Sequence, residues 1–326
     1  MSPRPRTGAA AVAAVALVVG GCAHTTAPPS ARLWIGGDVF LGAGGQRALA
    51  AVPALVGGAP GIVNLEGPVG EDGAGPRQGS AATGGDRAGD DAPARAAPAP
   101  IRLLQAPRAL AELRDAGVAV AGIANNHARD AGPTGAGATI RALTAAGVRA
   151  AGAAAGAATL TLGGLRIVVT AHDLEAGVPA DLRAELAAAR RRGDVLVATF
   201  HVTGPATYLP RPELLDAVAI ALEAGASVDA AHGTHELARV ERRGRAVIAW
   251  GLGNLAFACA CTDEETGALL EVTLSPGGAG AAAIVPIDAG LAGGAAHAAA
   301  DPALTFELLE ALGATRLRRR GDRATF

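Results

Sequence analysis

Several short apolar segments of this chain end in side chains that can bind metal ions or phosphate. Asp38, Glu66 and His201 each lie at the end of such a segment. Carboxylate and imidazole groups together suit first-row divalent cations such as Mn, Fe or Zn. The sequence therefore predicts a metal site assembled from the ends of several strands.

The most concentrated of these stretches is residues 122–132, which follow another apolar run. They place Asn125, Asn126 and His127 where a buried strand would end. In α/β proteins the carboxyl ends of parallel strands face the ligand crevice, because helices cover the faces of the sheet. The position favours a site, although an Asn-Asn turn with Asp130 capping the next helix is the alternative.

Taken together, the clusters predict two groups of residues: metal ligands, and a histidine that acts on the reacting group. The predicted metal ligands are Asp38, Glu66, Asn126, His201, His232 and His235. Two ions are more plausible than one, because a carboxylate can bridge two cations that clamp a transferring phosphoryl group or polarise an amide. His127 is then free to stabilise the reacting group or to protonate a leaving group. A turn at Asp38, a solvated Glu66 and a hydrogen-bonded rim histidine at His201 are the alternatives.

The elements that must position these residues alternate between strands and helices. The expected strands cover 32–36, 61–63, 118–120, 165–170, 195–200, 228–231, 247–250, 268–274 and 283–286; the expected helices begin at Pro107 or cover 139–146, 181–192, 212–224 and 305–312. This alternation predicts an α/β fold with a largely parallel sheet, or two sheets, and the polar clusters along one rim. The Arg-rich tail is expected to fray.

Composition excludes several classes of function. The 326 residues are 50% hydrophobic and carry a formal net charge of -2, and none of them is Lys. A Schiff-base enzyme and a phosphate-binding loop both require Lys, so both are excluded. No Gly-x-Ser-x-Gly elbow is present, which argues against a serine hydrolase. Without a basic stripe, and with 2% aromatic residues, nucleic acid is not expected as a partner.

The first residues indicate export. Arg4 and Arg6 precede the apolar residues 9–19, a run too short to span a bilayer, which ends in Gly20-Gly21-Cys22. Small residues before a Cys favour a lipoprotein signal with lipid on Cys22; an ordinary signal peptide with an incidental Cys is the alternative. The predicted location is the extracytoplasmic side of a membrane, either the cell surface or the periplasm.

The chain divides into four predicted parts: a signal peptide 1–21, a tether 22–31, a main domain 32–261 with a disordered insertion 70–100, and C-terminal strands and a helix, 262–326, that complete the same domain. The insertion is inferred because it lacks the apolar residues that a core needs. Cys259 and Cys261 are one residue apart, a spacing that strains a disulfide, and are expected to be free or incidental.

These residues, in this order, resemble the CapA (PgsA) poly-γ-glutamate capsule-synthesis family, whose domain is similar to calcineurin-like metallophosphoesterases. The matching blocks are Gly37–Gly42, Asn64–Pro68, Ala124–His127 with Asp130 and Gly132, Phe200–His201, His232–His235 and Gly251–Leu255. The chain departs from the family after His201, where residues 202–207 lack the usual Trp-Gly and a nearby Glu. It also departs at Gly233 and Thr234, which take the positions of a second His and a Pro, although a His-Gly-Pro-His form also occurs in the family.

The resemblance implies a layered α/β/β/α sandwich with its site at the strand-end rim. It also implies a surface lipoprotein that makes, exports or anchors anionic polyglutamate or a related polymer, with a membrane polyglutamate synthase as a possible partner. We assign His127 and Asp130 as the catalytic pair and Asn64, Asn125 and Asn254 as other rim residues. Two alternatives remain: an exported metal-dependent phosphoesterase or isopeptide hydrolase unrelated to capsule, and a catalytically inactive polymer-binding scaffold.

Overall fold

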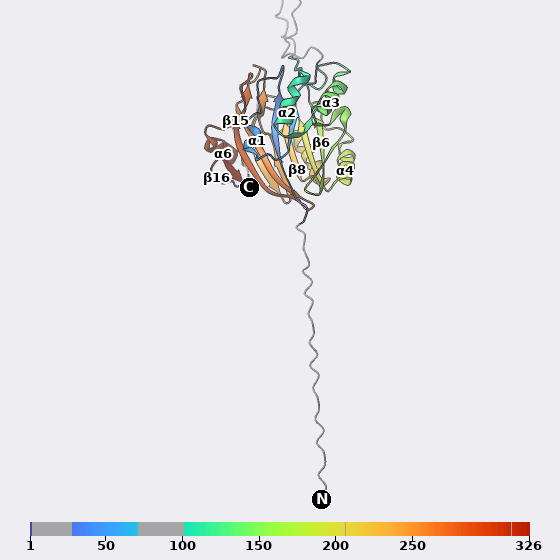
Figure 1. Cartoon of the computed structure of the whole chain (residues 1–326), viewed down its shortest axis with the longest axis vertical. Helices are drawn as coiled ribbons and strands as arrows, with labels where there is room; N and C mark the ends of the chain where they lie inside the picture. The colour runs from blue at the N-terminus through green and yellow to red at the C-terminus, as the bar shows by residue number, and fades with distance from the viewer. Residues whose placement is uncertain (2–27, 71–100, 206, 314) are drawn as a thin grey trace, which may run out of the picture.

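The chain folds into two β-sheets packed face to face, with helices on the outer face of each (Figure 1). The computed structural model describes residues 1, 28–70, 101–205, 207–313 and 315–326. The architecture is a layered α/β sandwich, as the sequence predicts. The signal peptide, Cys22 and residues 71–100 of the predicted insertion lie outside the described residues. Gly70 is described, and its N–H donates to the Gln105 carbonyl at 3.1 Å.

The first sheet has the order β16-β17-β13-β12-β1-β2-β3-β4. Three further strands join it: β11 pairs with β1, β14 pairs with β11, and β15 pairs with β13. Its strands are β1 (Ala31–Phe40), β2 (Gly61–Leu65), β3 (Val118–Gly122), β4 (Arg149–Ala151), β11 (Asn254–Phe257), β12 (Thr266–Ser275), β13 (Gly278–Asp288), β14 (Gly290–Leu291), β15 (His297–Ala298), β16 (Arg318–Arg320) and β17 (Arg323–Thr325). β1 to β4 are parallel, whereas β12 and β13 are antiparallel. The sheet is therefore mixed.

The second sheet has the order β5-β6-β7-β8-β10-β9. Its strands are β5 (Ala158–Leu162), β6 (Leu165–Asp173), β7 (Val195–His201), β8 (Val228–His232), β9 (Val240–Arg243) and β10 (Ala246–Ala249). The four central strands β6, β7, β8 and β10 are parallel. Their carboxyl ends consequently share one edge.

The main core lies between the sheets. β1 shows how it is built: Leu33 and Ile35 face the second sheet, whereas Trp34 between them faces the helices. Because successive side chains of a strand point to opposite faces, strands covered on both sides need apolar residues at every position. This explains the continuous apolar runs that the sequence shows before each polar cluster.

Short helices cover the outer faces. The first sheet packs against α1 (Val52–Leu55), η1 (Pro107–Leu110), α2 (Ala111–Asp115) and α3 (Gly135–Ala145), and the second against α4 (Leu182–Arg192) and α5 (Pro212–Glu223). η2 (Ala153–Ala155) follows β4, and α6 (Pro302–Ala311) adds Phe306 and Leu309 to the inner core. None of the described helices is long and apolar enough to cross a membrane.

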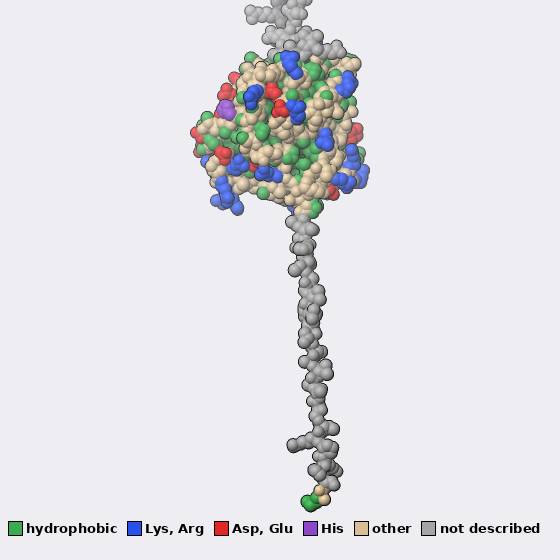
Figure 2. All heavy atoms as spheres, viewed as in Figure 1, with side chains coloured by type: hydrophobic (Ala, Val, Ile, Leu, Met, Phe, Trp, Pro, Cys, Tyr) green, Lys and Arg blue, Asp and Glu red, His purple; other side chains and the backbone are tan. Residues whose placement is uncertain are grey.

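The structure corrects three expectations. The Gly/Ala-rich residues after α3 form β4 and β5 rather than only a turn. The Arg-rich tail is not frayed, because β16 and β17 form a hairpin that pairs with β13. Its arginines are exposed at the edge of the molecule beside the label β16 of Figure 1, where Figure 2 shows a group of basic side chains. Cys259 and Cys261 are joined in a disulfide; their Cα atoms, 5.1 Å apart, lie within the usual range for such a bond.

Candidate metal centre

The carboxyl ends of strands from both sheets meet at one edge of the molecule. In the first sheet, Asp38 of β1 pairs in register with Asn64 of β2 and with Asn254 of β11. In the second sheet, His201 at the end of β7 lies beside His232 at the end of β8. The register of the two sheets therefore gathers polar residues that are far apart in the sequence.

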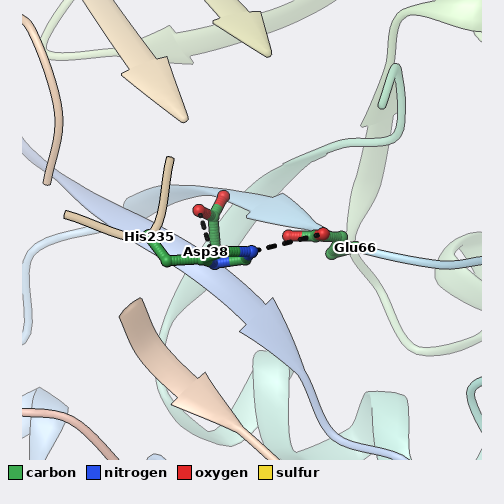
Figure 3. A group of neighbouring side chains, drawn as sticks. All are labelled: Asp38, Glu66 and His235. Atoms are coloured by element: carbon green, nitrogen blue, oxygen red, sulfur yellow. Dashed lines mark ion pairs between the residues drawn. The ribbon is translucent and has the colours of Figure 1, made fainter. Parts of the chain in front are cut away.

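Asp38, Glu66 and His235 form the centre of this cluster (Figure 3). One ligand atom from each residue lies within 4.8 Å of the others. His235 Nδ1 is 3.4 Å from Asp38 Oδ2, and His235 Nε2 is 3.9 Å from Glu66 Oε1. Asp38 and Glu66 are each 1% exposed. Two buried carboxylates thus converge on one imidazole.

Asn254 fixes the orientation of His235. Asn254 Nδ2 donates to the Glu264 carbonyl at 3.1 Å, so its Oδ1 faces His235 Nδ1 at 2.8 Å. A carbonyl oxygen only accepts hydrogen bonds, and the proton of neutral His235 therefore lies on Nδ1. The lone pair of Nε2 is left toward Glu66, which is the arrangement of histidines that bind a metal.

The loop after β8 has unusual backbone angles. His235 has a φ of 61° and Gly233 a φ of 98°. A Cβ at position 233 would lie 2.8 Å from His201 Nε2, and the Gly233 N–H donates to Asp38 Oδ2 at 3.0 Å. Positive φ at a non-glycine residue is uncommon and occurs preferentially at functional sites. Gly233 thus allows this loop to pass close to His201 while its N–H donates to Asp38.

A chain of side-chain amides supports the first sheet's half of the centre. Asn64 Nδ2 donates to Asp38 Oδ1 at 2.7 Å and lies 3.2 Å from His201 Nδ1. Asn125 Nδ2 in turn donates to Asn64 Oδ1 at 3.2 Å. On the other side of its ring, His201 Nε2 lies 3.0 Å from Asn126 Oδ1. In this arrangement both nitrogens of His201 are engaged by amides.

Other buried atoms at the centre lack partners. Among the described residues, Glu66 Oε2 and both ring nitrogens of His232 have no hydrogen bond. His232 Nδ1 lies 3.7 Å from Asp38 Oδ1. Leaving a buried polar group without a partner costs about 1–3 kcal/mol. A ligand that accepts electron pairs from these atoms would remove that cost.

The charges at the centre favour a cation. Burial and the neighbouring Asp38 raise the pKa of Glu66. Burial also disfavours the Asp38 carboxylate, but its hydrogen bond and charge interaction with His235 lower the pKa of Asp38 below its usual range. Although burial alone would lower the pKa of His235, Asp38 and Glu66 raise it to about 9. The two carboxylates therefore stabilise positive charge between them.

These residues fit a divalent metal ion. Asp38 and Glu66 offer carboxylate oxygens, His235 offers Nε2, and His232 offers nitrogens with no other partner. A mixed oxygen and nitrogen set of this kind suits Mn, Fe or Zn. Burial lowers the pKa of His201 to about 4, so its imidazole is neutral beside them.

His127 faces the same centre from the loop after β3. Its Nδ1 is 2.7 Å from Asp130 Oδ2, and its Nε2 is 3.9 Å from Glu66 Oε1. Asp130 Oδ2 also accepts the N–H of Leu103 at 2.6 Å, which fixes the carboxylate. A histidine oriented by a carboxylate through one nitrogen presents the other for proton transfer.

The structure brings the sequence-predicted residues into one region but in different roles. Asp38, Glu66 and His235 share a ligand-sized space, and His232, His127 and Asp130 border it. His201 and Asn126 contact each other, so their assignment as ligands stays a prediction. One contributor was missed from the sequence: the backbone N–H of Gly233, which donates to Asp38 Oδ2.

Comparison with known proteins gives a family match. The model for the bacterial capsule synthesis protein PGA_cap matches residues 43–258, more than half of the chain. The chain is similar to a phosphatase from Mycoplasma pneumoniae, with a TM-score of 0.50 and 14% identity over 81% of this chain and 96% of that one. It also matches a hypothetical protein from Thermus thermophilus, with a TM-score of 0.49 and 16% identity over 79% of this chain and 99% of that one.

No curated protein matches the chain. At these identities the solved structures bear on the fold alone, and the first of them agrees with the layered sandwich described above. The family match includes Glu66, His127, His201 and His235, all of which lie at the rim of that sandwich. The chain therefore belongs to the family of the bacterial capsule synthesis protein PGA_cap.

Proposed function

We propose that this chain is an exported, lipid-anchored hydrolase with a divalent metal centre. In this proposal it acts in the synthesis, export or anchoring of poly-γ-glutamate or a related envelope polymer. The observation that carries the hydrolytic part is the convergence of Asp38, Glu66 and His235 within 4.8 Å. The family match supports the polymer part.

In the proposed site, Asp38, Glu66 and His235 would hold the cation, with His232 beside them. When bound, a divalent cation polarises the scissile phosphoester and lowers the pKa of water. Hydrogen bonds within the chain fix the ligand side chains in place: Asn64 and Gly233 hold Asp38, and Asn254 holds His235. Burial excludes bulk water, which strengthens every charge interaction at the reacting group.

His127 supplies the proton in this proposal. Asp130 holds Nδ1, so Nε2 is the nitrogen that exchanges a proton with the leaving group. Its side chain is 18% exposed, and a substrate can therefore reach it from solvent. A positioned acid of this type contributes about 10²–10⁴-fold to a rate.

Metal analysis and an activity screen of the purified protein test the hydrolytic part. We expect bound Mn, Fe or Zn, and hydrolysis of a small phosphoester such as p-nitrophenyl phosphate that a chelator abolishes. A polyglutamate substrate is assayed in parallel, because an isopeptide hydrolase would cleave it instead. A protein with neither metal nor hydrolysis would be a polymer-binding scaffold.

The envelope role is tested in cells. Loss of the gene is expected to reduce envelope-associated polyglutamate, with restoration by the wild-type chain and not by Asp38→Ala. Cys22→Ala is expected to release the chain from the membrane and to change its mature mass. Unchanged polymer would favour an exported hydrolase unrelated to capsule, and unchanged membrane partition and mass would contradict the lipid anchor.

A further inference from the structure

A cavity of about 870 Å³ lies beside the metal centre. Asn126 connects the two, since it lines the cavity and its Oδ1 contacts His201 Nε2 at 3.0 Å. The remaining wall comes from the loop after β3, the residues after β4, the end of β6 with the residues that follow it, and one side of α4. A molecule that fills the cavity therefore ends next to the centre.

Small side chains make this cavity possible. Ala124, Gly152, Ala171 and Ala188 all line it, and none of them fills the space. Along α4 the wall extends from Asp181 to Arg192, roughly 16 Å at the rise of an α-helix. The cavity is thus long enough for several residues of an extended chain.

The wall carries charges of both signs. Its acidic residues are Asp173, Glu175, Asp181 and Glu185, and its basic residues are Arg129 and Arg192. Among the described residues, neither guanidinium has an ion-pair partner. Asp181 stands at the N-cap of α4, but its side chain makes no capping hydrogen bond. The carboxylates outnumber the guanidinium groups, so a continuous polyanion is repelled, whereas a molecule with an amine next to carboxylates is matched.

Two residues of the wall, Thr170 and His172, also carry buried polar atoms without a hydrogen bond among the described residues. Thr170 is 5% exposed, and its Oγ1 has no hydrogen bond within the described part of the chain. The same holds for Nε2 of His172, whose ring stacks on Phe200 with centroids 5.8 Å apart. Buried polar atoms without partners are rare in folded proteins, but these two atoms are themselves buried and do not face the open cavity, so the charged side chains decide which ligand fits.

We propose that this cavity binds the amino-terminal end of a peptide-like polymer that carries carboxylates. Asp173, which pairs in register with His201, and Asp181 match the terminal ammonium group, while Arg129 and Arg192 match the carboxylates of the first residues. The polymer's identity rests on the proposed function, but the recognition of a chain end does not. The interior of the same polymer carries only negative charge and is the poorer ligand.

Calorimetric titration tests this proposal with a tri-γ-glutamate that has a free amino end and with its N-acetyl form. We expect the free form to bind at least tenfold more tightly. Arg192→Ala should weaken its binding at least tenfold, whereas Arg191→Ala, the adjacent exposed residue outside the cavity wall, should not. Asp181→Asn should remove the preference over the N-acetyl form. Circular dichroism and melting temperatures confirm that each variant is folded.

Equal binding of the two peptides, or equal effects of Arg191→Ala and Arg192→Ala, would overturn the proposal. The titration is repeated with chelator, and p-nitrophenyl phosphate hydrolysis is measured on the same samples. Hydrolysis without end-selective binding would reject the cavity and leave the proposed hydrolase intact. End-selective binding in a protein that holds no metal and hydrolyses nothing would support the cavity and reject the hydrolase.

Discussion

Two regions with several carboxylates lie side by side in this protein and differ in burial. At the metal centre, Asp38 and Glu66 are 1% exposed and converge on histidines. In the neighbouring cavity, Glu175, Asp181 and Glu185 are exposed. A buried carboxylate needs a counter-charge that stays in place, whereas an exposed one is solvated and can exchange partners. On the two proposals above, burial, more than residue type, distinguishes a site for a resident cation from a site for a passing ligand.

Removal of one carboxylate from each region gives the largest expected contrast. Asp38→Ala should abolish metal binding and hydrolysis, because it removes a ligand and leaves one carboxylate, Glu66, to balance the charge of the cation. Bound metal also stabilises the fold, by about 3–4 kcal/mol at 100–1,000 times its Kd. Asp181→Ala should change neither metal content nor melting temperature. Elemental analysis and thermal denaturation of both variants measure this, and equal metal loss in the two would remove the distinction between the regions.

His127→Ala should separate metal binding from chemistry. We expect metal content and melting temperature to remain at the wild-type level, while kcat falls about 10²–10⁴-fold because the proton donor is lost. His297→Ala, an exposed histidine on β15, serves as the control. A parallel loss of metal in His127→Ala would show that His127 is a ligand.

Asn254→Ala should have a smaller effect on the same centre. It removes the acceptor that holds His235 in one tautomer, and loss of such a partner weakens metal affinity about 10–100-fold. Asn254→Asp keeps an acceptor oxygen and should lose less. Competition with a metallochromic chelator gives both affinities. If Asn254→Ala bound metal as tightly as the wild type, the support inferred for His235 would be wrong.

Asp229 of β8 sharpens the comparison with a third case, a buried carboxylate without metal-binding neighbours. Both of its oxygens lack a hydrogen bond among the described residues, and burial raises its pKa well above 3.8. The folded protein thus binds this proton more tightly than the unfolded chain does. The contribution of the Asp229 proton to the free energy of unfolding is full below pH 3.8. Between pH 3.8 and the folded pKa, that free energy falls by about 1.4 kcal/mol per pH unit.

Urea denaturation across this pH range measures that contribution. Asp229→Asn should reduce the slope of unfolding free energy against pH, and the exposed Asp216→Asn should not. The same slope in Asp229→Asn and the wild type would contradict a protonated Asp229.

Much of the strand-end site could be predicted from the sequence. Asp38, Glu66 and His201 each follow an apolar run, which indicates the end of a buried strand. Because the carboxyl ends of parallel strands share an edge, these residues were expected at one edge of the molecule. Sequence spacing does not encode distances across the two sheets. It therefore left open which polar residues meet, and it did not show that amides engage both nitrogens of His201.

The errors have similar causes. β4 and β5 are short and rich in Ala and Thr, so they lack the bulky apolar pattern that identifies a strand. The tail 318–325 is polar because only Ala324 is buried there, yet its backbone pairs with β13. Cys259 and Cys261 were judged on spacing alone, whereas the backbone around them sets the distance between their Cα atoms.

The direction of β1 has a consequence for access. The strand starts at Ala31, next to the predicted tether, and Asp38 lies near its far end, roughly 23 Å away at the rise of a β-strand. If Cys22 carries lipid as proposed, Asp38 lies at the end of β1 farther from the point where the tether joins the domain. On that proposal, a soluble polymer would reach the centre by diffusion from outside the cell membrane. A substrate whose reacting bond lies at the lipid headgroups would have to extend across the full height of β1.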